Sequence, residues 1–344
     1  MASQAYQITS PSTLTLTTLP TPVPSPGPNE VLLRLHATSL NYRDILVIDH
    51  SPAYPVRAKQ NLIPFSDGAG VISTVGPGSR WKAGDRVVLH PNPWLHGNDA
   101  RGFDVRTVFG GGETDGTARR WMVVSDENLV KMPKGMGMEE ASTMFTAGAT
   151  AFRSLFHNGA VKAGPGVRVL TQGTGGVSCF AIMLAAAAGA EVVATSSSDE
   201  KLEFAKKLGA THLINYRKHP DWDKEVLSVT DGKGVDLVCD VVGAGSIEKT
   251  IKATAFGGFV SVMGMLGEDF AKPVDIMTDL LFGAKTLQGQ LGASSREVFE
   301  EMSAFMEKHD LHPPVAQVFE FEQAEEALKA LTTLTVPGKI VVRC

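Results

Sequence analysis

The sequence predicts an α/β protein that combines a doubly wound parallel sheet with a second, β-rich part. From residue 167 onward, short apolar strands alternate with helical segments of roughly ten residues, which is typical of a parallel sheet covered by helices. Before residue 130 the strand-like pieces are separated by Gly, Pro and Asp, which favours irregular antiparallel structure. With 344 residues, 43% of them hydrophobic, the chain is long enough for two domains and too apolar to be disordered.

Charge and cysteine content exclude several classes of protein. The net charge of −5 leaves no basic footprint for general nucleic-acid binding. Cys179, Cys239 and Cys344 are far apart in sequence, so we expect neither a disulfide framework nor a cysteine-rich zinc site. The chain does not start like a signal peptide, and its longest apolar run, residues 180–190, is too short to cross a bilayer. We therefore expect a soluble, cytoplasmic protein with no membrane partner.

The first third of the chain is expected to be β-rich. Apolar segments bounded by turn residues predict strands over 13–19, 30–37, 70–75, 85–90 and 121–124. Prolines alternate between residues 20 and 28; they fit a rigid connection between two strands better than a polyproline ligand, because a strand follows at once. The glycine-studded stretch 91–120 predicts a long functional or mobile loop. His90 and His96 are expected to be loop or surface residues there.

The later part of the chain alternates between helices and strands. The pattern predicts helices over 139–151, 177–188, 200–208, 221–230, 246–255, 296–308 and 322–331, and strands over 167–171, 191–195, 212–215, 235–240, 259–263 and 339–342. Ser197 and Glu200 are placed for a capping box at the start of the helix over 200–208. Gly209 is placed to end that helix.

A glycine-rich turn connects the strand over 167–171 to the next helix. Between a strand and a helix of repeated βα units, this pattern is typical of a dinucleotide-binding loop. Gly173 permits the tight turn, and Gly175 lets the backbone approach a pyrophosphate that rests on the helix N-terminus. Ser178 is small enough for the close packing required at the third position and can hydrogen-bond phosphate. The expected cofactor-binding residues of this loop are Gly173, Thr174, Gly175, Gly176, Val177 and Ser178.

The end of the following strand indicates which nicotinamide cofactor is bound. An NAD site carries an acidic residue about twenty residues after the loop, where it holds the ribose hydroxyls. Ser196 stands at that position, and Asp199 follows too late in the sequence. With no carboxylate to repel a 2′-phosphate, and with Ser196, Ser197 and Lys201 available to bind it, NADPH is favoured over NADH. Lys201 is equally well explained as an exposed helix residue.

Several motifs, in a fixed order along the chain, resemble the medium-chain dehydrogenase/reductase superfamily, and in particular its zinc-free quinone-oxidoreductase-like branch. They comprise 39–44 (SLNYRD), 63–70 (IPFSDGAG), 75–76 (VG), 84–87 (GDRV), 150–152 (TAF), the loop at Gly173, 215–217 (NYR), 240–243 (DVVG) and 338–341 (GKIV). The likeness covers nearly the whole chain. It implies a GroES-like catalytic domain of residues 1–130 and 293–344, built from both chain ends around an inserted Rossmann domain of residues 131–292.

The resemblance also implies that zinc is absent. Zinc-containing members hold their metal with a Cys in the segment matching Asn41, a His-Glu pair matching Ser66 and Asp67, and a further Cys or His in the helix matching 139–151. This chain has no Cys or His in that helix, and no Cys in 91–120, where the structural zinc lobe of the family falls. Zinc prefers sulfur and imidazole ligands, for which Asn and Ser are poor substitutes.

Loss of zinc changes the reaction that the resemblance implies. Alcohol oxidation benefits from a metal that stabilises alkoxide. Hydride transfer from NADPH to a quinone or to the C=C bond of an α,β-unsaturated carbonyl instead places charge on a carbonyl oxygen, which hydrogen bonds can stabilise. Asn41 is expected to orient substrate or the nicotinamide amide. Tyr42, Arg43 and Asp44 are second candidates with a scaffold role as the alternative, and the proton donor stays open between Tyr42, Tyr54 and solvent.

Further site residues are carried over by position. Tyr216 either joins Lys201 at the 2′-phosphate or packs under the adenine edge. The other expected cofactor contacts are Val242, Gly243, Gly264, Met265 and Leu291; the expected pocket walls are Phe65, Trp94, Phe145 and Phe282, with Trp94 also explicable as core. In many relatives the matching strand joins two Rossmann sheets, so a homodimer through residues 286–291 is expected.

Two other functions stay open. Zinc-free relatives include lens crystallins, so a non-enzymatic NADPH-binding protein shares the same motifs, and tight NADPH binding without hydride transfer to any acceptor would indicate it. A stand-alone enoyl reductase acting on acyl thioesters would instead show selectivity for such substrates.

Overall fold

The computed structural model describes residues 2–22, 24–101, 103–265, 273–333 and 336–344. It divides into two units: the first comprises Met1–Thr146, Ser294–Thr335 and Lys339–Cys344, and the second comprises Ala147–Ala293 and Val336–Gly338. The sequence placed the boundary at residue 130. In the structure the first unit continues to Thr146, because helix α2 (Met138–Ser142) packs on the sheet of that unit.

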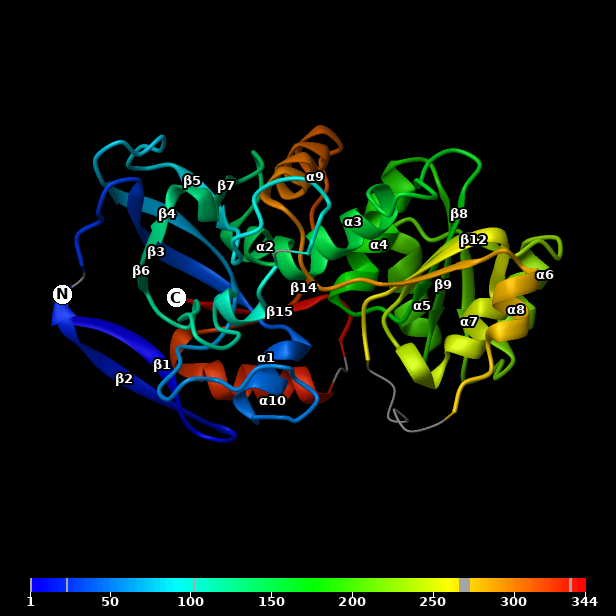
Figure 1. Cartoon of the computed structure of the whole chain (residues 1–344), viewed down its shortest axis with the longest axis horizontal. Coiled ribbons are helices and arrows are strands. Elements are labelled where there is room, and N and C mark those ends of the chain that lie inside the picture. The colour runs from blue at the N-terminus through cyan, green and yellow to red at the C-terminus, as the bar shows by residue number, and fades with distance from the viewer. Residues whose placement is uncertain (1, 23, 102, 266–272, 334–335) are drawn as a thin grey trace. The chain divides into compact units, whose positions relative to one another are not determined.

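The first unit is built on a seven-stranded, mostly antiparallel sheet. Its order is β14-β15-β3-β4-β5-β7, with β6 paired to β3. The strands are β3 (Glu30–Ser39), β4 (Asp67–Val75), β5 (Arg86–Leu89), β6 (Trp121–Ser125), β7 (Leu129–Lys131), β14 (Val315–Phe319) and β15 (Lys339–Arg343). Strand β15 pairs antiparallel with β3, where Val341 lies opposite Ser39. The last strand of the chain thereby joins the sheet that β3 begins (Figure 1).

A hairpin and four helices complete the first unit. They are β1 (Ala2–Ser10) with β2 (Thr13–Pro22), α1 (Tyr42–Ile48), α2, α9 (Arg296–Lys308) and α10 (Ala324–Thr333). In α9, Val298, Phe299, Met302 and Met306 are buried and recur on one face, as an amphipathic helix requires. The hydroxyl of Ser295 accepts a hydrogen bond from the backbone N–H of Val298 and caps the start of this helix.

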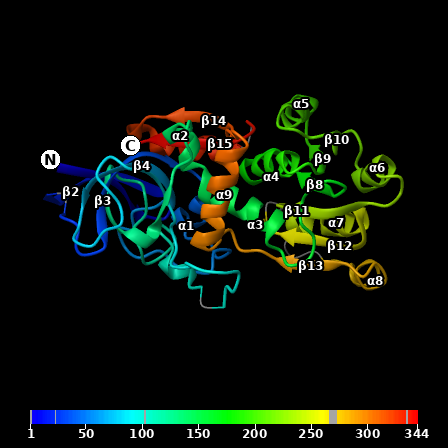
Figure 2. The ribbon, with the colours of Figure 1, turned by 90° about the horizontal axis from the view of Figure 1, so that it is seen from above.

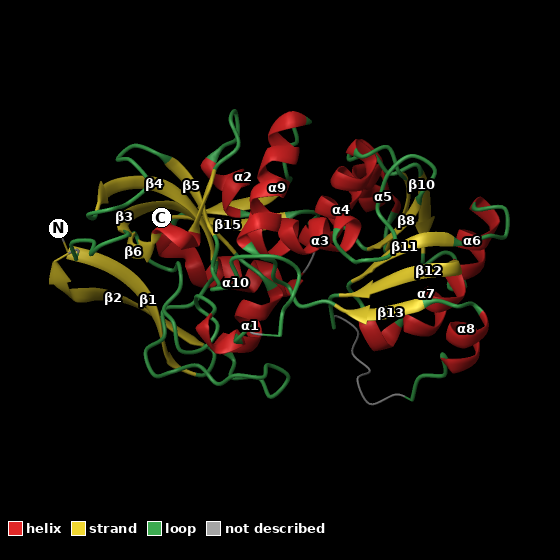
Figure 3. Cartoon of the chain, turned by 45° about the horizontal axis from the view of Figure 1, so that its top comes forward, coloured by secondary structure: helices red, strands yellow, loops and turns green. Residues whose placement is uncertain are grey.

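The second unit is a doubly wound parallel sheet, as the sequence predicted. Its strand order is β10-β9-β8-β11-β12-β13, and each neighbouring pair is parallel. The strands are β8 (Arg168–Gln172), β9 (Glu191–Ser196), β10 (His212–Asn215), β11 (Val235–Asp240), β12 (Thr254–Val262) and β13 (Thr286–Gly289); the helices are α3 (Thr150–Phe156), α4 (Gly176–Ala187), α5 (Asp199–Lys207), α6 (Trp222–Val229), α7 (Ile247–Ala253) and α8 (Met277–Phe282). This is the Rossmann order, with α4 and α5 on one side of the sheet and α6 and α7 on the other (Figure 3).

The interior strands of this sheet are apolar because both of its faces are covered. Val192, Val193 and Ala194 of β9 are fully buried in succession, which an alternating strand would not allow. The start of α5 differs from the prediction: the hydroxyl of Ser198, not that of Ser197, accepts the backbone N–H of Lys201. Gly209 ends the helix with a φ of +112°, as expected of a glycine at this position.

The helix predicted over 139–151 is interrupted in the structure. Helix α2 ends at Ser142, a π-helix spans Met144–Ala149, and α3 begins at Thr150. Wide helical turns of this kind are frequent at functional sites because they release backbone groups from the regular ladder. Here the backbone N–H of Thr146 turns to the carboxylate of Asp67. Within the described residues, the helices are all too short or too polar to cross a membrane.

Candidate active site

The glycine loop of the second unit is fixed by hydrogen bonds to neighbouring residues, whereas open space lies beside Gly173 and Gly175. Strand β8 ends at Gln172 and helix α4 begins at Gly176. Gly173 has a φ of +72°, and an added Cβ at Gly173 or Gly175 would meet no atom within 4 Å. The hydroxyl of Ser178 donates to the carbonyl of Gln172 at 2.7 Å, so this side chain packs the loop and its hydrogen is not available to a phosphate. Open space therefore lies beside Gly173 and Gly175 at the start of α4, where a pyrophosphate is expected.

Two backbone contacts fix this loop. The N–H of Gly173 donates to Thr195 at 2.7 Å, and the N–H of Gly338 donates to Thr174 at 3.1 Å. The second contact comes from Val336–Gly338, the short C-terminal segment that belongs to the second unit. The segment immediately before β15 therefore lies next to the glycine loop.

The ends of β9 and β10 surround the expected ribose position. Ser196 is buried at the end of β9, and its carbonyl accepts the N–H of Tyr216, whose side chain is 40% exposed. Asp199 accepts hydrogen bonds from Lys218 and from Nδ2 of Asn215, and the bond from Lys218 is the main reason that the pKa of Asp199 is lowered. The one carboxylate near this position is therefore already engaged by its own neighbours, while Lys201 lies in the first turn of α5.

Two turns lie in contact after strands β11 and β12. Oδ1 of Asp240 accepts the N–H groups of Val242 and Gly243 at 2.9 and 2.7 Å, and Oδ2 accepts the hydroxyl of Thr250. Burial raises the pKa of Asp240, and these hydrogen bonds oppose the rise. A Cβ at Gly243 would lie 2.8 Å from the carbonyl oxygen of Gly264, so both turns require glycine. The sequence-predicted residues Val242, Gly243 and Gly264 are thus brought together here.

The first unit contains a buried polar network centred on Asn41. Nδ2 of Asn41 donates to Oδ2 of Asp67 at 3.1 Å, and its Oδ1 accepts a hydrogen bond of 2.5 Å from the ammonium of Lys339. Lys339 also donates to the carbonyl of Leu40 at 2.6 Å and lies 3.9 Å from Oδ2 of Asp67. Burial lowers the pKa of Lys339, whereas the carboxylates of Asp67 and Asp44 raise it.

Asp67 is the acceptor on which the network converges. It is fully buried at the start of β4. Oδ1 accepts the hydroxyls of Ser66 at 3.1 Å and Thr146 at 2.6 Å. Oδ2 accepts the backbone N–H of Thr146 at 3.2 Å and the hydroxyl of Ser39 at 3.4 Å, besides the Asn41 amide. These donors satisfy the hydrogen-bonding capacity of the buried carboxyl group.

The first turn of α1 carries a second buried carboxylate. Asp44 is fully buried, and its Oδ2 accepts the backbone N–H of Asn41 at 2.8 Å. Burial raises its pKa from 3.8 to about 6, and the neighbouring Arg43 opposes this. In the described chain, Nε and Nη2 of Arg43 and the hydroxyl of Tyr54 are buried without a hydrogen-bond partner. Tyr42, by contrast, is 42% exposed at the start of α1.

The donor set around Asn41 does not fit a catalytic zinc ion. Asn41, Ser66 and Asp67 offer an amide, a hydroxyl and a carboxylate, whereas zinc in proteins is held mainly by thiolate and imidazole. The cationic ammonium of Lys339 is also hydrogen-bonded to Asn41 and adjacent to Asp67, and a second cation there would be repelled. Within the described ranges, no group of three His, Cys, Asp or Glu side chains is arranged to hold a metal.

The predicted pocket walls lie in different places. Phe65, Trp94 and Phe145 are buried in the first unit. Phe282 is 78% exposed on α8 of the second unit. Phe145 packs edge-on against His90, with ring centroids 5.0 Å apart. His90 follows β5 in a loop, as one of the two alternatives predicted, but it does not lie at the surface: it is fully buried, its Nε2 donates to the carbonyl of Ser294, and burial lowers its pKa to about 4.

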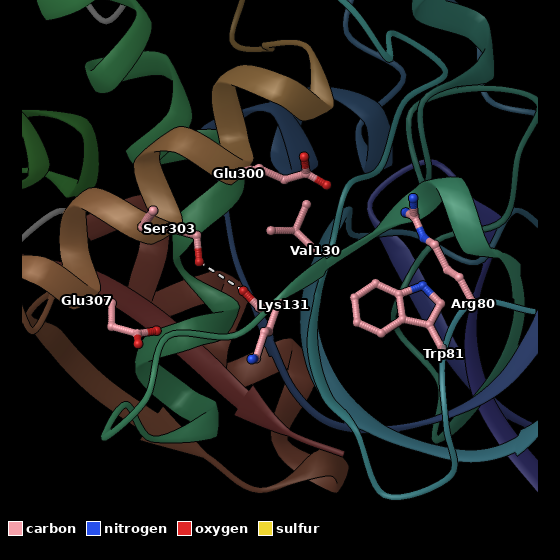
Figure 4. A pocket seen from close by; sticks show the side chains of 8 residues that line it. Arg80, Trp81, Val130, Lys131, Glu300, Ser303 and Glu307 are labelled. Atoms are coloured by element: carbon pink, nitrogen blue, oxygen red, sulfur yellow. Dashed lines mark hydrogen bonds between the residues drawn. The ribbon is translucent and has the colours of Figure 1, made fainter.

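A separate cavity of about 350 Å³ lies in the first unit, away from the residues of the network. Figure 4 shows Glu300, Ser303 and Glu307 of α9 on one side of it, and Trp81 and Arg80 on the other. The hydroxyl of Ser303 donates to the carbonyl of Lys131 across its floor. None of the residues that the sequence singled out lines this cavity.

Sequence reasoning missed two members of the network. Lys339 lies 298 residues from Asn41, and Thr146 lies 79 residues from Asp67. The available signal for Lys339 was a lysine at the first position of an otherwise apolar strand, where a buried ammonium is costly unless it is paired. Thr146 reaches Asp67 from the π-helix, and no periodic sequence pattern predicts a π-helix.

Comparisons with known proteins agree with this architecture. Residues 27–134 match the alcohol dehydrogenase GroES-like domain, and residues 176–308 match the zinc-binding dehydrogenase domain. A zinc-type alcohol dehydrogenase-like protein of Schizosaccharomyces pombe is 39% identical over 318 residues, which cover 91% of this chain and 90% of that protein. The quinone oxidoreductase of Mus musculus is 27% identical over 305 residues, covering 87% and 84% of the two chains.

Solved structures give the same result. A structure described as an NAD-dependent alcohol dehydrogenase has a TM-score of 0.88, 32% identity and 99% coverage of both chains. A crotonyl-CoA carboxylase/reductase in complex with NADP has a TM-score of 0.85 and 25% identity, and covers 99% of this chain and 94% of that chain. With both domains matched and a relative of 39% identity spanning nearly its full length, this chain belongs to the medium-chain dehydrogenase/reductase superfamily of oxidoreductases.

Proposed function

We propose that this protein is an NADPH-dependent reductase of quinones or of the activated C=C bond of α,β-unsaturated carbonyls, and that it works without zinc. The observation that carries the proposal is the Asn41 amide, fixed between Lys339 and Asp67 at the position where zinc relatives have a metal ligand. The likeness to the mouse quinone oxidoreductase supports the same substrate class.

The chemistry needs a hydrogen-bond donor where negative charge develops. When bound, NADPH supplies the hydride, and the carbonyl oxygen of a conjugated acceptor becomes more negative as it is reduced. The Asn41 amide carries two N–H hydrogens and gives one to Asp67, so the second is the donor for that oxygen. The ammonium of Lys339 behind the amide adds a fixed positive charge that favours the same developing anion.

The choice of NADPH over NADH rests on the end of β9. Ser196 replaces the acidic residue that binds the ribose diol in NAD sites. Asp199 does not take over that task, because its carboxylate is engaged by Lys218 and Asn215. We expect Lys201 and Tyr216 to lie beside the 2′-phosphate, and a Kd for NADPH at least tenfold below that for NADH.

The test is a comparison of reactions under one set of conditions. Purified protein is mixed with NADPH and either a 1,2-quinone or an enone, and in parallel with NADP⁺ and a panel of alcohols. The proposal requires NADPH oxidation in the first pair and much slower NADP⁺ reduction in the second. Robust alcohol oxidation without quinone or enone reduction would contradict it.

Acyl thioesters are a second candidate substrate class. The structural likeness to a crotonyl-CoA carboxylase/reductase supports it, because that name describes reduction of an α,β-unsaturated thioester. The same donor from Asn41 would serve a thioester carbonyl. Crotonyl-CoA in the assay decides between the two classes: a kcat/KM at least tenfold above that of simple enones would assign the thioester.

We also propose a homodimer through the edge strand β13. Figure 2 shows β13 at the margin of the second unit's sheet with α8 beside it. Met277, Leu281 and Phe282 of α8 are 67%, 69% and 78% exposed. An unpaired strand edge flanked by exposed apolar side chains is typical of a surface that pairs with a second copy.

A further inference from the structure

We propose that Lys339 is a positioning residue of this site, whose ammonium sets the direction in which the side-chain amide of Asn41 points. Asn41 is the residue that the proposed function places on substrate, and the inference rests on that function for its catalytic consequence. The inference about orientation itself depends only on the contacts within the first unit.

The two neighbours of the amide have opposite and fixed hydrogen-bonding character. A lysine ammonium carries three donors and no acceptor, and an ionised carboxylate only accepts. Lys339 lies 2.5 Å from one end of the Asn41 amide, and Asp67 lies 3.1 Å from the other. The oxygen must therefore face Lys339 and the nitrogen must face Asp67.

A flipped amide would lose both interactions and gain two repulsions. Its NH₂ group would meet the ammonium of Lys339, and its oxygen would meet the carboxylate of Asp67. Asp67 cannot turn to relieve this, because Ser66 and the backbone and hydroxyl of Thr146 hold its two oxygens. The network thus admits one orientation, in which the remaining N–H of Asn41 is always presented as a donor.

Lys339 is itself held in place. Its Nζ donates to the carbonyl of Leu40, the residue before Asn41, at 2.6 Å. The charged groups that face it are Asp67 of β4 and Asp44 and Arg43 of α1, two anions and one cation. The residues that follow in β15, Ile340, Val341 and Val342, are all buried and apolar. A buried ion pair generally contributes little net stability compared with apolar side chains of similar size, so the conformational specificity of Asn41 is the more direct consequence of this lysine.

The experiment combines kinetics with a direct readout of the amide. The variants are Lys339→Met, Lys339→Gln and Asn41→Ala, the double variant of Lys339→Met with Asn41→Ala, and Lys285→Met as a matched control. Lys285 also donates to a backbone carbonyl, at 2.6 Å, and burial also lowers its pKa, but it contacts no residue of the network. Each protein is measured for kcat and KM, for NADPH affinity by fluorescence, and for the ¹⁵N side-chain amide signals of Asn41, identified by their loss in Asn41→Ala.

The positioning role predicts a specific pattern. Lys339→Met lowers kcat at least tenfold with NADPH affinity within twofold of wild type, shifts or broadens the Asn41 amide signals, and causes no further loss in the Asn41→Ala background. Lys285→Met resembles wild type in all three readouts. Unchanged Asn41 signals in Lys339→Met, or equal losses from this lysine with and without Asn41, would overturn the proposal.

Two further outcomes separate this proposal from the function on which it rests. If Asn41→Ala keeps full activity, the catalytic use of Asn41 fails, while the amide signals still test its orientation by Lys339. If Lys339→Met does not fold, Lys339→Gln takes its place: a neutral amide accepts as well as donates, so the barrier against a flipped Asn41 amide falls, and the Asn41 signals should shift or broaden although Asp67 still favours one orientation. A single, wild-type-like set of signals in Lys339→Gln would refute the role of the charge.

Discussion

The amide nitrogen of Asn41 donates to Oδ2 of Asp67 at 3.1 Å, although the two residues lie 26 positions apart at the ends of different elements. Asn41 directly precedes α1 and Asp67 opens β4. Because the carboxylate accepts from both backbone and side-chain donors, the amide is held by a partner that cannot itself turn. This pair carries the predictions for the first unit. The predictions for the second unit rest on Ser196 and on the apolar side chains of α8.

Removal of the Asn41 amide is expected to slow reduction strongly. Loss of one donor to a developing oxyanion typically costs about 10²- to 10³-fold in kcat. Asn41→Ala should therefore lower kcat by about this factor, with NADPH affinity little changed, as measured by steady-state kinetics and fluorescence titration. Asn128→Ala is the control, because that amide donates to the carbonyl of His90 and lies outside the network. A kcat within threefold of wild type for Asn41→Ala would rule out the proposed donor.

The buried carboxyl of Asp44 should make stability depend on pH. Its pKa is raised from 3.8 in the unfolded chain to about 6 in the folded one, so between about pH 4 and 6 the folded protein holds a proton that the unfolded chain releases. The free energy of unfolding therefore falls as the pH rises through this window, by up to about 3 kcal/mol. Asp44→Asn should remove this loss. Urea unfolding at pH 4 and pH 7 measures it, with Asp231→Asn, an exposed side chain, as the control.

If the free energy of unfolding changed equally with pH in wild type and in Asp44→Asn, the raised pKa of Asp44 would be contradicted. The expected result is that the stability of wild type relative to Asp44→Asn falls by up to about 3 kcal/mol between pH 4 and pH 7. Since both proteins share every other titrating group, their difference isolates this carboxyl.

An acidic residue at the end of β9 should reverse the cofactor preference. Ser196→Asp places a carboxylate where the 2′-phosphate of NADPH is proposed to bind, and repulsion should raise the Kd for NADPH at least tenfold while NADH binds as well or better. Ser228→Asp adds the same charge on the exposed side of α6 and serves as the control. Equal losses for both cofactors in Ser196→Asp would indicate damage to the fold instead of a change in selectivity.

A charge on the apolar face of α8 should dissociate the proposed dimer. Phe282→Asp is expected to convert a dimer into a monomer in light scattering, because it places a carboxylate in an apolar interface. Val75→Asp is the control: Val75 is 37% exposed at the end of β4 in the first unit and belongs to neither β13 nor α8. Dissociation by the control and not by Phe282→Asp would place the interface elsewhere.

Sequence predicted best those elements whose pattern is local. The alternation of β8 to β12 with α4 to α7 was visible because each strand carries a short apolar run and a helical segment of about ten residues follows each of β8 to β11. Strand β1 was missed because Ser3 and Gln4 interrupt its apolar period, and helix α1 was missed because the Arg43-Asp44 pair does the same. The cap of α5 was displaced by one residue because three consecutive serines offer the same hydroxyl.

The site was predictable only in part, for a physical reason. Gly173 and Gly175 were singled out from adjacent residues of one loop, and in the structure an added Cβ at either would meet no atom within 4 Å. Asn41 was singled out from its sequence motif, but Lys339 and Thr146, which orient it directly or through Asp67, come from β15 and from the π-helix. Such partners are brought together only by the tertiary structure. No pattern within one element indicates which distant charged side chain will hydrogen-bond a buried amide.

The most direct test of the proposed chemistry is NADPH oxidation by the purified protein in the presence and absence of a zinc chelator. Reduction of a 1,2-quinone or an enone, at a rate that the chelator leaves unchanged and that Asn41→Ala lowers about 100-fold, is the predicted result. Loss of activity on chelation, restored by added zinc, would contradict it, as would alcohol oxidation in the absence of any quinone or enone reduction.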